Sequence, residues 1–259
     1  MNKGTFSGIL IAIAGIAIGL YLDGGKIQQM LQPTAAMIVF GGTLGAVMVQ
    51  FPLTVLKKAM EELRDVFIHS KDPGPALAET LMRYAIKARR NGVLSLDSEI
   101  ETIQNEFLRR AVTLAVDGTH PAELRKTMEL EMEKEMDQDS QSPRVFEAAG
   151  GFAPTIGILG AVIGLIQVMQ RLENINEVGK GIAVAFVATI YGVGSANLFF
   201  LPCAGRIKTQ MRRKQALREM MLDGVIGIVE KTNTRLLEAN LELYSNNPAQ
   251  AAREELVLR

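Results

Sequence analysis

The chain has 259 residues, of which 48% are hydrophobic, and its 28 basic residues balance its 28 acidic ones. A formal net charge of zero points to neither nucleic acid nor an anionic substrate as a partner, so the distribution of charge along the chain carries the information. The single cysteine, Cys203, excludes an internal disulfide bond.

The hydrophobic residues gather into blocks that are too long for the core of a soluble domain. Four stretches contain no Asp, Glu, Lys or Arg, namely Gly4–Leu22, Ile27–Leu56, Ala148–Gln170 and Gly181–Gly205. Each is long enough to cross a bilayer, because a spanning helix needs about 20 apolar residues. We therefore predict an all-α membrane protein with four transmembrane helices, at Thr5–Leu22, Thr34–Leu53, Phe152–Gln170 and Ile182–Leu201. The first is predicted to be retained, since no signal-peptide cleavage pattern follows it.

The connections between these spans are very unequal in length and charge. Residues 23–33 and 171–180 are short hairpins, whereas 54–147 is a long polar insertion and 206–259 a long polar tail. Most Lys and Arg residues lie in the insertion and the tail, so the positive-inside rule places both in the cytoplasm, together with the N-terminus. The predicted divisions are residues 1–53 with spans one and two, the insertion 54–147, residues 148–205 with spans three and four, and the tail 206–259. The orientation is predicted to depend on a basic cluster after span four: Arg206, Lys208, Arg212, Arg213, Lys214 and Arg218.

The insertion is predicted to be helical, because its apolar residues recur at helical spacing. One helix is expected to begin near Pro75 and to stop at Gly92, since proline suits a first turn and glycine a helix end. Two further helices are predicted at about Asp97–Val116 and Pro121–Asp137. The tail is predicted to be one long helix, Ile207–Tyr244, that continues out of span four.

Small residues at four-residue spacing predict close packing of the spans. Such pairs let helix backbones approach, and in lipid this packing must replace the hydrophobic drive. The pairs are Gly15 and Gly19, Gly41 and Gly45, and Gly160 and Gly164.

No predicted span contains Asp, Glu, Lys, Arg or His, although intramembrane ionisable groups are what proton relays and most coupled transporters use. Spans three and four do contain Thr155 and Thr189, whose hydroxyls either line a hydrated path or bond to a helix backbone. Pro154 is predicted in the first turn of span three, and Pro202 is predicted to bend or end span four. The chain therefore has the features of half an ion pathway whose carboxylate comes from a partner.

Three segments resemble the MotA/PomA flagellar stator A-subunits, within the wider group that includes TolQ and ExbB. Residues 153–165, APTIGILGAVIGL, resemble the family's third span, and residues 183–192, AVAFVATIYG, with Asn197 and Pro202, resemble its fourth. Residues 89–99, RRNGVLSLDSE, resemble its rotor-facing segment. The resemblance covers nearly the whole chain.

The resemblance implies a stator ring subunit of the flagellar motor in the bacterial inner membrane. In that family, five A-subunits surround the paired helices of a B-subunit, MotB or PomB, whose single aspartate carries the ion. Ion flow turns the ring in the surrounding lipid, and the cytoplasmic insertion pushes on the rotor protein FliG. No cofactor, metal or catalytic residue is implied, so we do not expect an enzyme.

Individual residues match the family's functional positions. Pro154 and Pro202 match two prolines linked to conformational coupling, and Thr189 matches a threonine that faces the B-subunit aspartate. The residues that match rotor-contacting positions are Arg89 and Asp97, with Arg90 and Glu99 as close neighbours of the same type.

Protons are predicted as the coupling ion, because two hydroxyls that sodium-driven relatives carry are missing. Those relatives place threonine where this chain has Ala161 and Ala188. Sodium needs several oxygen ligands to replace its water, whereas a proton needs only an acid and a hydrogen-bonded path.

Two other functions are alternatives to the stator subunit. A TolQ/ExbB-like subunit, which would energise envelope machinery, typically has three spans, so the extra hairpin Thr5–Leu53 and the segment 89–99 argue against it. A small transporter or structural scaffold is the other alternative, although a transporter should carry its own intramembrane charge.

Overall fold

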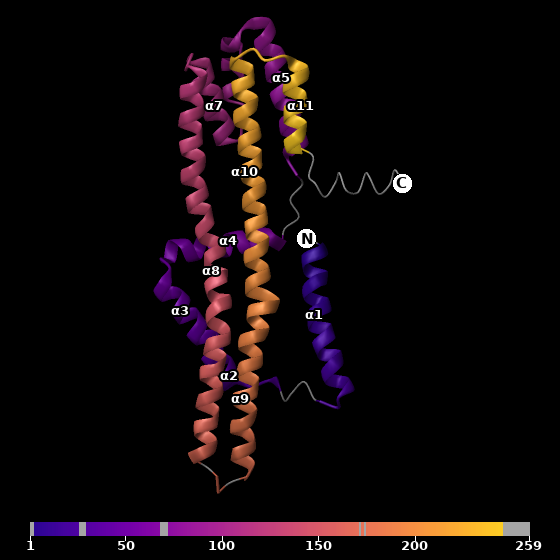
Figure 1. The fold of residues 1–259 in the computed structure, drawn as a ribbon, viewed down its shortest axis with the longest axis vertical. Coiled ribbons are helices and arrows are strands. Elements are labelled where there is room, and N and C mark those ends of the chain that lie inside the picture. The colour runs from indigo at the N-terminus through magenta and orange to yellow at the C-terminus, as the bar shows by residue number, and fades with distance from the viewer. Residues whose placement is uncertain (1–2, 26–29, 68–71, 171, 174, 246–259) are drawn as a thin grey trace. The chain divides into compact units, whose positions relative to one another are not determined.

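The computed structural model describes residues 3–25, 30–67, 72–170, 172–173 and 175–245. Every regular element in this part of the chain is a helix, which confirms the predicted all-α class (Figure 1). The chain forms two compact units. Unit 1 contains residues 1–69 and 139–209, and unit 2 contains residues 70–138 and 210–259.

Unit 1 contains the apolar helices. They are α1 (Lys3–Leu22), α2 (Pro33–Ala36), the π-helix η2 (Met37–Gly41), α3 (Gly42–Gln50), α4 (Leu53–Phe67), the end of α8 (Pro121–Gln170), α9 (Ile175–Ser195), the π-helix η4 (Ala196–Phe200) and the start of α10 (Leu201–Val229). Three stretches are long and apolar enough to cross a membrane: Pro33–Gln50, Pro121–Gln170 and Val178–Val229. A shorter apolar stretch, Leu10–Leu22, lies in α1. Helices that are long and apolar enough to span a membrane are thus confirmed, whereas the count of four spans stays a prediction.

Helices α8 and α9 form an antiparallel hairpin that is packed through small residues (Figure 1). A Cβ atom added to Gly157 would lie 2.9 Å from the carbonyl oxygen of Ala188, and one added to Gly164 would lie 2.9 Å from that of Gly181. No side chain larger than hydrogen fits at these positions without movement. We call this contact the α8–α9 seam; its residues are Ala153, Gly157, Gly160 and Gly164 of α8 and Gly181, Ala185, Ala188 and Gly192 of α9.

The predicted glycine pairs have different outcomes. Gly160 and Gly164 do pack closely, because both belong to the seam. By contrast, Cβ atoms added to Gly15, Gly19, Gly41 or Gly45 would meet no other described part of the chain within 4 Å, apart from the adjacent residues and backbone of their own helix.

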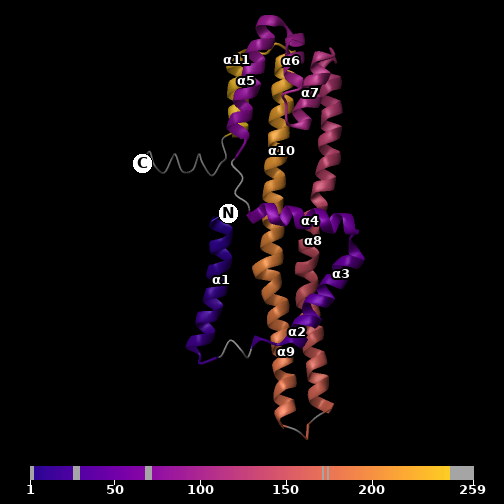
Figure 2. The ribbon, with the colours of Figure 1, turned by 180° about the vertical axis from the view of Figure 1, so that it is seen from behind.

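Span two covers one side of the α8–α9 hairpin. Ala35 and Val39 are fully buried in a cluster with Val184, Val187 and Ala188 of α9. Ile38 lies against Gly160, and Ile156 of α8 lies against Gly42. Helix α4 then lies across α8, where Ala59 is buried and Lys58 pairs with Asp139 at 2.7 Å (Figure 2).

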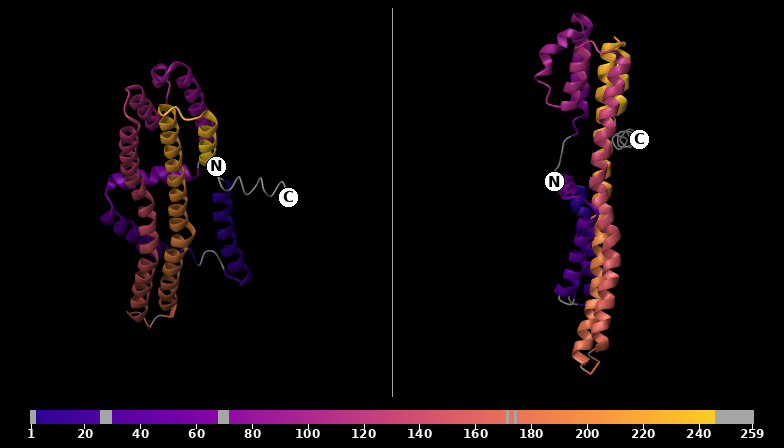
Figure 3. Two further views of the ribbon diagram at one scale, coloured as in Figure 1. Left: turned by 45° about the horizontal axis from the view of Figure 1, so that its top comes forward. Right: turned by 90° about the vertical axis from the view of Figure 1, so that its left-hand side faces the viewer.

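Unit 2 has a conventional hydrophobic core. Its elements are α5 (Gly74–Asn91), the 3₁₀ helix η3 (Val93–Leu96), α6 (Asp97–Ile100), α7 (Glu106–Val116), the start of α8, the end of α10 and α11 (Thr234–Ser245). Leu81, Leu124, Met128, Met220 and Leu241 are at most 1% exposed in this core. α5 and α11 lie side by side (Figure 3). As predicted, α5 carries proline in its first turn and ends before Gly92, whose φ is 82°.

Two predicted helices are broken in the structure. Residues 97–116 form α6 and α7 instead of one helix, because the side chain of Asn105 caps α7 by accepting the N–H of Leu108 at 3.0 Å. The single tail helix Ile207–Tyr244 is also wrong. The chain turns after Val229 through Lys231, whose φ is 56°, and Asn233 accepts the N–H of Arg235 at the start of α11. In both places an asparagine cap was overlooked.

Candidate functional site

The α8–α9 seam leaves one side of both helices uncovered. Ala161 follows the seam residue Gly160, and Thr189 follows the seam residue Ala188, so each side chain is turned by about 100° from the contact. Because the helices are antiparallel, this step turns both side chains to the same side, opposite to span two. Large apolar residues accompany them there: Ile158 is 58% exposed, Leu165 51%, Phe186 70% and Val193 45%. We call these six residues the open flank.

Thr189 is the polar residue of the open flank. Its side chain is half-buried, and its hydroxyl donates to the carbonyl of Ala185 at 3.3 Å. This distance is long for an O–H···O hydrogen bond, which is usually near 2.7–2.8 Å. The hydroxyl also keeps lone pairs that can accept, so it is available to a group that approaches the flank.

The structure separates Thr155 from the other two predicted pathway residues. Thr155 lies two positions after the seam residue Ala153, which turns it about 200° away from the contact with α9. Its side chain is exposed, and its hydroxyl donates to the carbonyl of Phe152 at 2.8 Å. Ala161 and Thr189 therefore share a surface, and Thr155 lies on the far side of α8.

Both predicted prolines lie within continuous helical segments. Pro154 is in the interior of α8, which begins at Pro121, so its placement in a first turn is wrong. Without an N–H, it cannot bond to the carbonyl of Gly150, and this weakens the helix locally. Pro202 does not end the helix either, since α10 continues to Val229. The irregular backbone lies just before it, in η4, and such π-helical turns often occur at functional sites.

Tyr191 was missed by the sequence analysis. Its hydroxyl donates to the carbonyl of Met30 at 2.5 Å and accepts the N–H of Gln32 at 3.3 Å, while its ring stacks on Phe40. These contacts fasten the start of span two to span four. A tyrosine inside an apolar span was the available signal, because a buried phenol needs a polar partner.

The segment predicted to face the rotor is a tight turn of unit 2. Arg89 and Arg90 lie in the last turn of α5, and Asp97 begins α6; all three side chains are exposed. Glu99 is instead paired with Lys87 at 2.6 Å. The hydrogen bond from Lys87 is the main reason why the pKa of Glu99 lies below its usual value.

Comparison with known proteins supports the resemblance seen in the sequence. The profile of the MotA/TolQ/ExbB proton channel family matches residues 99–220, and that of the motility protein A N-terminal region matches residues 6–91. Motility protein A of Bacillus subtilis is 33% identical over 245 residues, which are 94% of this chain and 91% of that protein. The chain belongs to the MotA/TolQ/ExbB proton channel family.

Two solved structures of this family have the same fold. The C. jejuni MotAB structure superposes with a TM-score of 0.89 at 31% identity, and the match covers 94% of this chain and 96% of that one. The flagellar MotAB stator complex from Bacillus subtilis gives a TM-score of 0.87 at 32% identity over 99% of both chains. The match to the motility protein A N-terminal region favours the stator branch over the TolQ/ExbB-like alternative.

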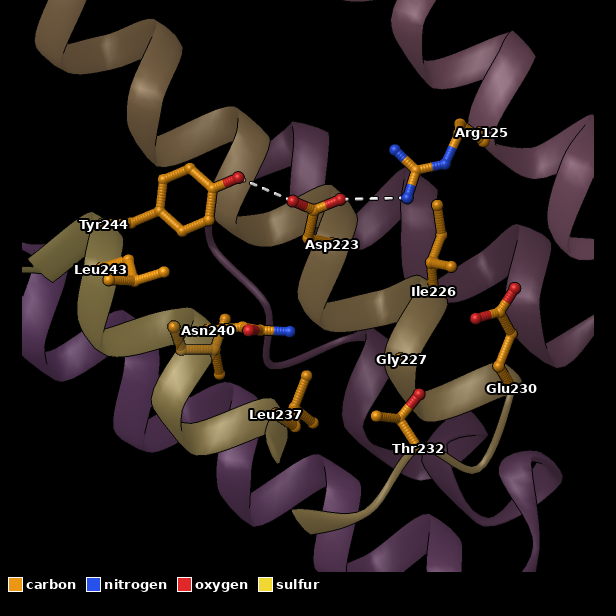
Figure 4. Close-up of a pocket in the computed structure, with 11 residues that line it drawn as sticks. Arg125, Asp223, Ile226, Gly227, Glu230, Thr232, Leu237, Asn240, Leu243 and Tyr244 are labelled. Carbon is orange, nitrogen blue, oxygen red and sulfur yellow. Dashed lines mark hydrogen bonds and ion pairs between the residues drawn. The ribbon is translucent and has the colours of Figure 1, made fainter. Parts of the chain in front are cut away.

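A pocket of about 520 Å³ lies in unit 2 between α10 and α11, with Arg125 of α8 at its edge. Figure 4 shows Asp223 between Tyr244 and Arg125. The Tyr244 hydroxyl donates to Asp223 at 2.7 Å, and Arg125 pairs with the same carboxylate at 3.0 Å. The hydrogen bond to Asp223 is the main reason why the pKa of Tyr244 rises to about 12. These groups satisfy one another and fasten α11, so we assign them a structural role.

Several residues of the basic cluster after span four form ion pairs or hydrogen bonds within unit 1 or within unit 2. Lys208 pairs with Glu147 in unit 1, and Arg218 pairs with Glu135 in unit 2. Arg213 donates to both carboxylate oxygens of Asp72 and to the carbonyl of Tyr244. These arginines and lysines therefore serve packing as well as the orientation predicted for them.

Proposed function

We propose that the chain works as the membrane ring subunit of a flagellar stator, together with a B-subunit that brings the ion-carrying aspartate. One observation carries this proposal: the open flank offers a hydroxyl in an apolar surface, and the predicted spans contain no Asp, Glu, Lys, Arg or His of their own. The MotAB complexes with the same fold support a B-subunit as the missing partner.

The chemistry of the open flank suits a carboxyl group that changes its protonation state. Thr189 both donates and accepts hydrogen bonds, so it can pair with the ionised and with the neutral acid. Phe186 and Val193 exclude water, which raises the cost of keeping the acid charged. Away from the Thr189 hydroxyl nothing on this surface offsets that cost, so ionisation holds the partner helix at Thr189 and protonation lets it leave. Repeated around a ring, this alternation produces directed rotation.

The arrangement in the cell is part of the same proposal. Four spans cross the inner membrane of a bacterium, the insertion and both termini are cytoplasmic, and five copies surround the B-subunit helices in lipid. Pro154 and Pro202 lie where α8 and the segment from α9 to α10 have weakened backbone bonding, which supports a role in conformational coupling. The insertion contacts the rotor protein FliG through Arg89, Arg90 and Asp97.

The proposal is tested at Thr189 by measuring proton flux through the chain assembled with its B-subunit in vesicles. Thr189→Val removes the hydroxyl at nearly constant volume, so proton flux should fall about tenfold or more, and Thr189→Ser should restore most of it. Thr209→Val is the matched control, since its hydroxyl makes the same bond to a carbonyl four residues earlier. Equal flux in the Thr189→Val variant and the wild type would exclude this threonine from the pathway.

The coupling ion is tested in swimming cells. Ala161 and Ala188 supply no oxygen from their side chains, so speed should respond to a proton uncoupler and should not change when sodium is replaced by potassium. A speed that rises and saturates with sodium concentration would reject protons as the coupling ion.

A further inference from the structure

An exposed leucine lies at the centre of the rotor-facing turn. Leu94 is 71% exposed in η3, while its neighbour Leu96 is 1% exposed in the core of unit 2. Single exposed leucines are common on protein surfaces, so this exposure is not sufficient evidence of a contact. Its rigid setting and its charged surroundings are the features that distinguish it.

The turn holds Leu94 in one position. Gly92 reverses the chain with a φ of 82°, a conformation that other residues rarely adopt. The N–H and the hydroxyl of Ser95 both donate to the carbonyl of Gly92, at 3.1 and 2.6 Å. Because the turn is already ordered, a partner that binds Leu94 loses little conformational entropy.

The base of the turn is closed by an internal clamp. The Lys87 ammonium donates to Glu99 at 2.6 Å and to the hydroxyl of Ser98 at 3.0 Å, which joins α5 to α6. Glu99 therefore braces the turn, and its rotor contact stays a prediction.

The exposed charges that precede and follow Leu94 along the chain have opposite signs. Arg89 and Arg90 precede it, Asp97 follows it, and within the described residues none of the three has an ion-pair partner. A protein partner that fits this pattern presents an apolar hollow between an acidic and a basic group. Exposed charges of this kind favour encounter and register more than affinity, so a further source of affinity is needed.

We propose that Leu94 is the apolar anchor of the rotor contact, and that Lys87 and Glu99 brace the turn that presents it. This inference rests on the rotor contact proposed above. Burial of the leucine supplies the holding energy, and the surrounding charges align the two surfaces.

The experiment measures how long single stator units stay engaged with the rotor, from the steps in the rotation speed of a bead attached to the motor. Leu94→Ala should shorten the engaged time about tenfold, because most of the leucine surface is lost. Leu94→Met keeps the size and apolarity of the side chain, so this variant should retain most of the wild-type engaged time. Leu130→Ala is the matched control, since Leu130 is 58% exposed on α8 of the same unit and should behave as wild type.

The other outcomes are distinguishable. An unchanged engaged time for Leu94→Ala, with lower torque for Arg89→Glu, would overturn the anchor and leave the rotor contact intact. If neither variant has an effect, the proposed contact at this turn is itself wrong. An equal loss for Leu130→Ala, or loss of assembled complex from the membrane for both Leu94 variants, would show a general role in folding or ring assembly and would also overturn the anchor.

Discussion

Glycine and alanine line the contact between α8 and α9 in unit 1, whereas leucine and methionine fill the core of unit 2. The difference follows from the solvent. Lipid tails are as apolar as leucine, so helices in a membrane gain from close backbone approach and not from removing apolar surface from water. In unit 2, burial of large side chains is itself the driving force.

Polar groups are also used differently in the two units. In the described part of unit 2, Arg125, Asp223 and Tyr244 satisfy one another, and Arg213 joins Asp72 to the end of α11. On the open flank of unit 1, the one hydrogen bond of the Thr189 hydroxyl within the described residues is a long one to the carbonyl of Ala185 in the same helix. Completed networks hold a structure in place, and an incomplete one is available to a partner.

Leu81→Ala in unit 2 should have the largest effect on stability. Leu81 is fully buried and touches Gly224, so the substitution leaves a cavity and should cost about 2–5 kcal/mol. Thermal unfolding of the purified complex measures the loss. Ile86→Ala on the same helix is the control, because Ile86 is 44% exposed; a similar loss there would contradict the assignment of the core.

Gly157→Ala in unit 1 tests the opposite kind of packing. Stability should fall there because a methyl group is added, whereas in unit 2 it should fall because side-chain volume is removed. The new Cβ would lie 2.9 Å from a backbone oxygen, so the α8–α9 hairpin must open at a cost of about 1–3 kcal/mol. The yield of assembled complex and its unfolding temperature should both fall. Gly194→Ala has open space and should be tolerated; equal tolerance at both glycines would argue against a tightly packed seam.

Asp72→Asn should have the smallest effect on stability, and the size of that effect should depend on pH. Burial raises the pKa of Asp72, but the hydrogen bonds from Arg213 and Gly74 and the charge of Arg213 outweigh it, so the net pKa lies below 3.8. Its stabilisation is therefore fully present above pH 3.8 and is lost as the pH falls through the lowered folded-state pKa.

Since Asp72 is partly exposed, the difference from wild type at pH 7 should be only about 1 kcal/mol or less. Unfolding midpoints measured from neutral to acid pH should converge as the carboxylate is protonated. The exposed Asp117→Asn is the control for loss of a charge. A difference that stays constant across this range would show that the pair with Arg213 is not its cause.

The positions of helices could be predicted where a single local feature of the sequence, such as an uncharged stretch or a proline and glycine pair, marks them. The uncharged stretches predicted the membrane-spanning helices, and Pro75 with Gly92 predicted the bounds of α5, because these signals are local. The breaks at Asn105 and Asn233 were missed, since a helical apolar pattern continues past each cap. Pro154 was misplaced because a change in polarity at residue 148 resembles a helix start, although α8 runs through it.

The sequence by itself determined the class of this protein, because the lengths of its uncharged stretches and the position of its basic residues depend only on composition along the chain. It also identified Thr189 as a residue of interest. Only the tertiary structure decided that Ala161 shares a surface with Thr189 while Thr155 does not, that Glu99 is held by Lys87, and that Leu94 is exposed. These outcomes depend on which helix faces pack together, and that choice is made by contacts between residues far apart in the chain.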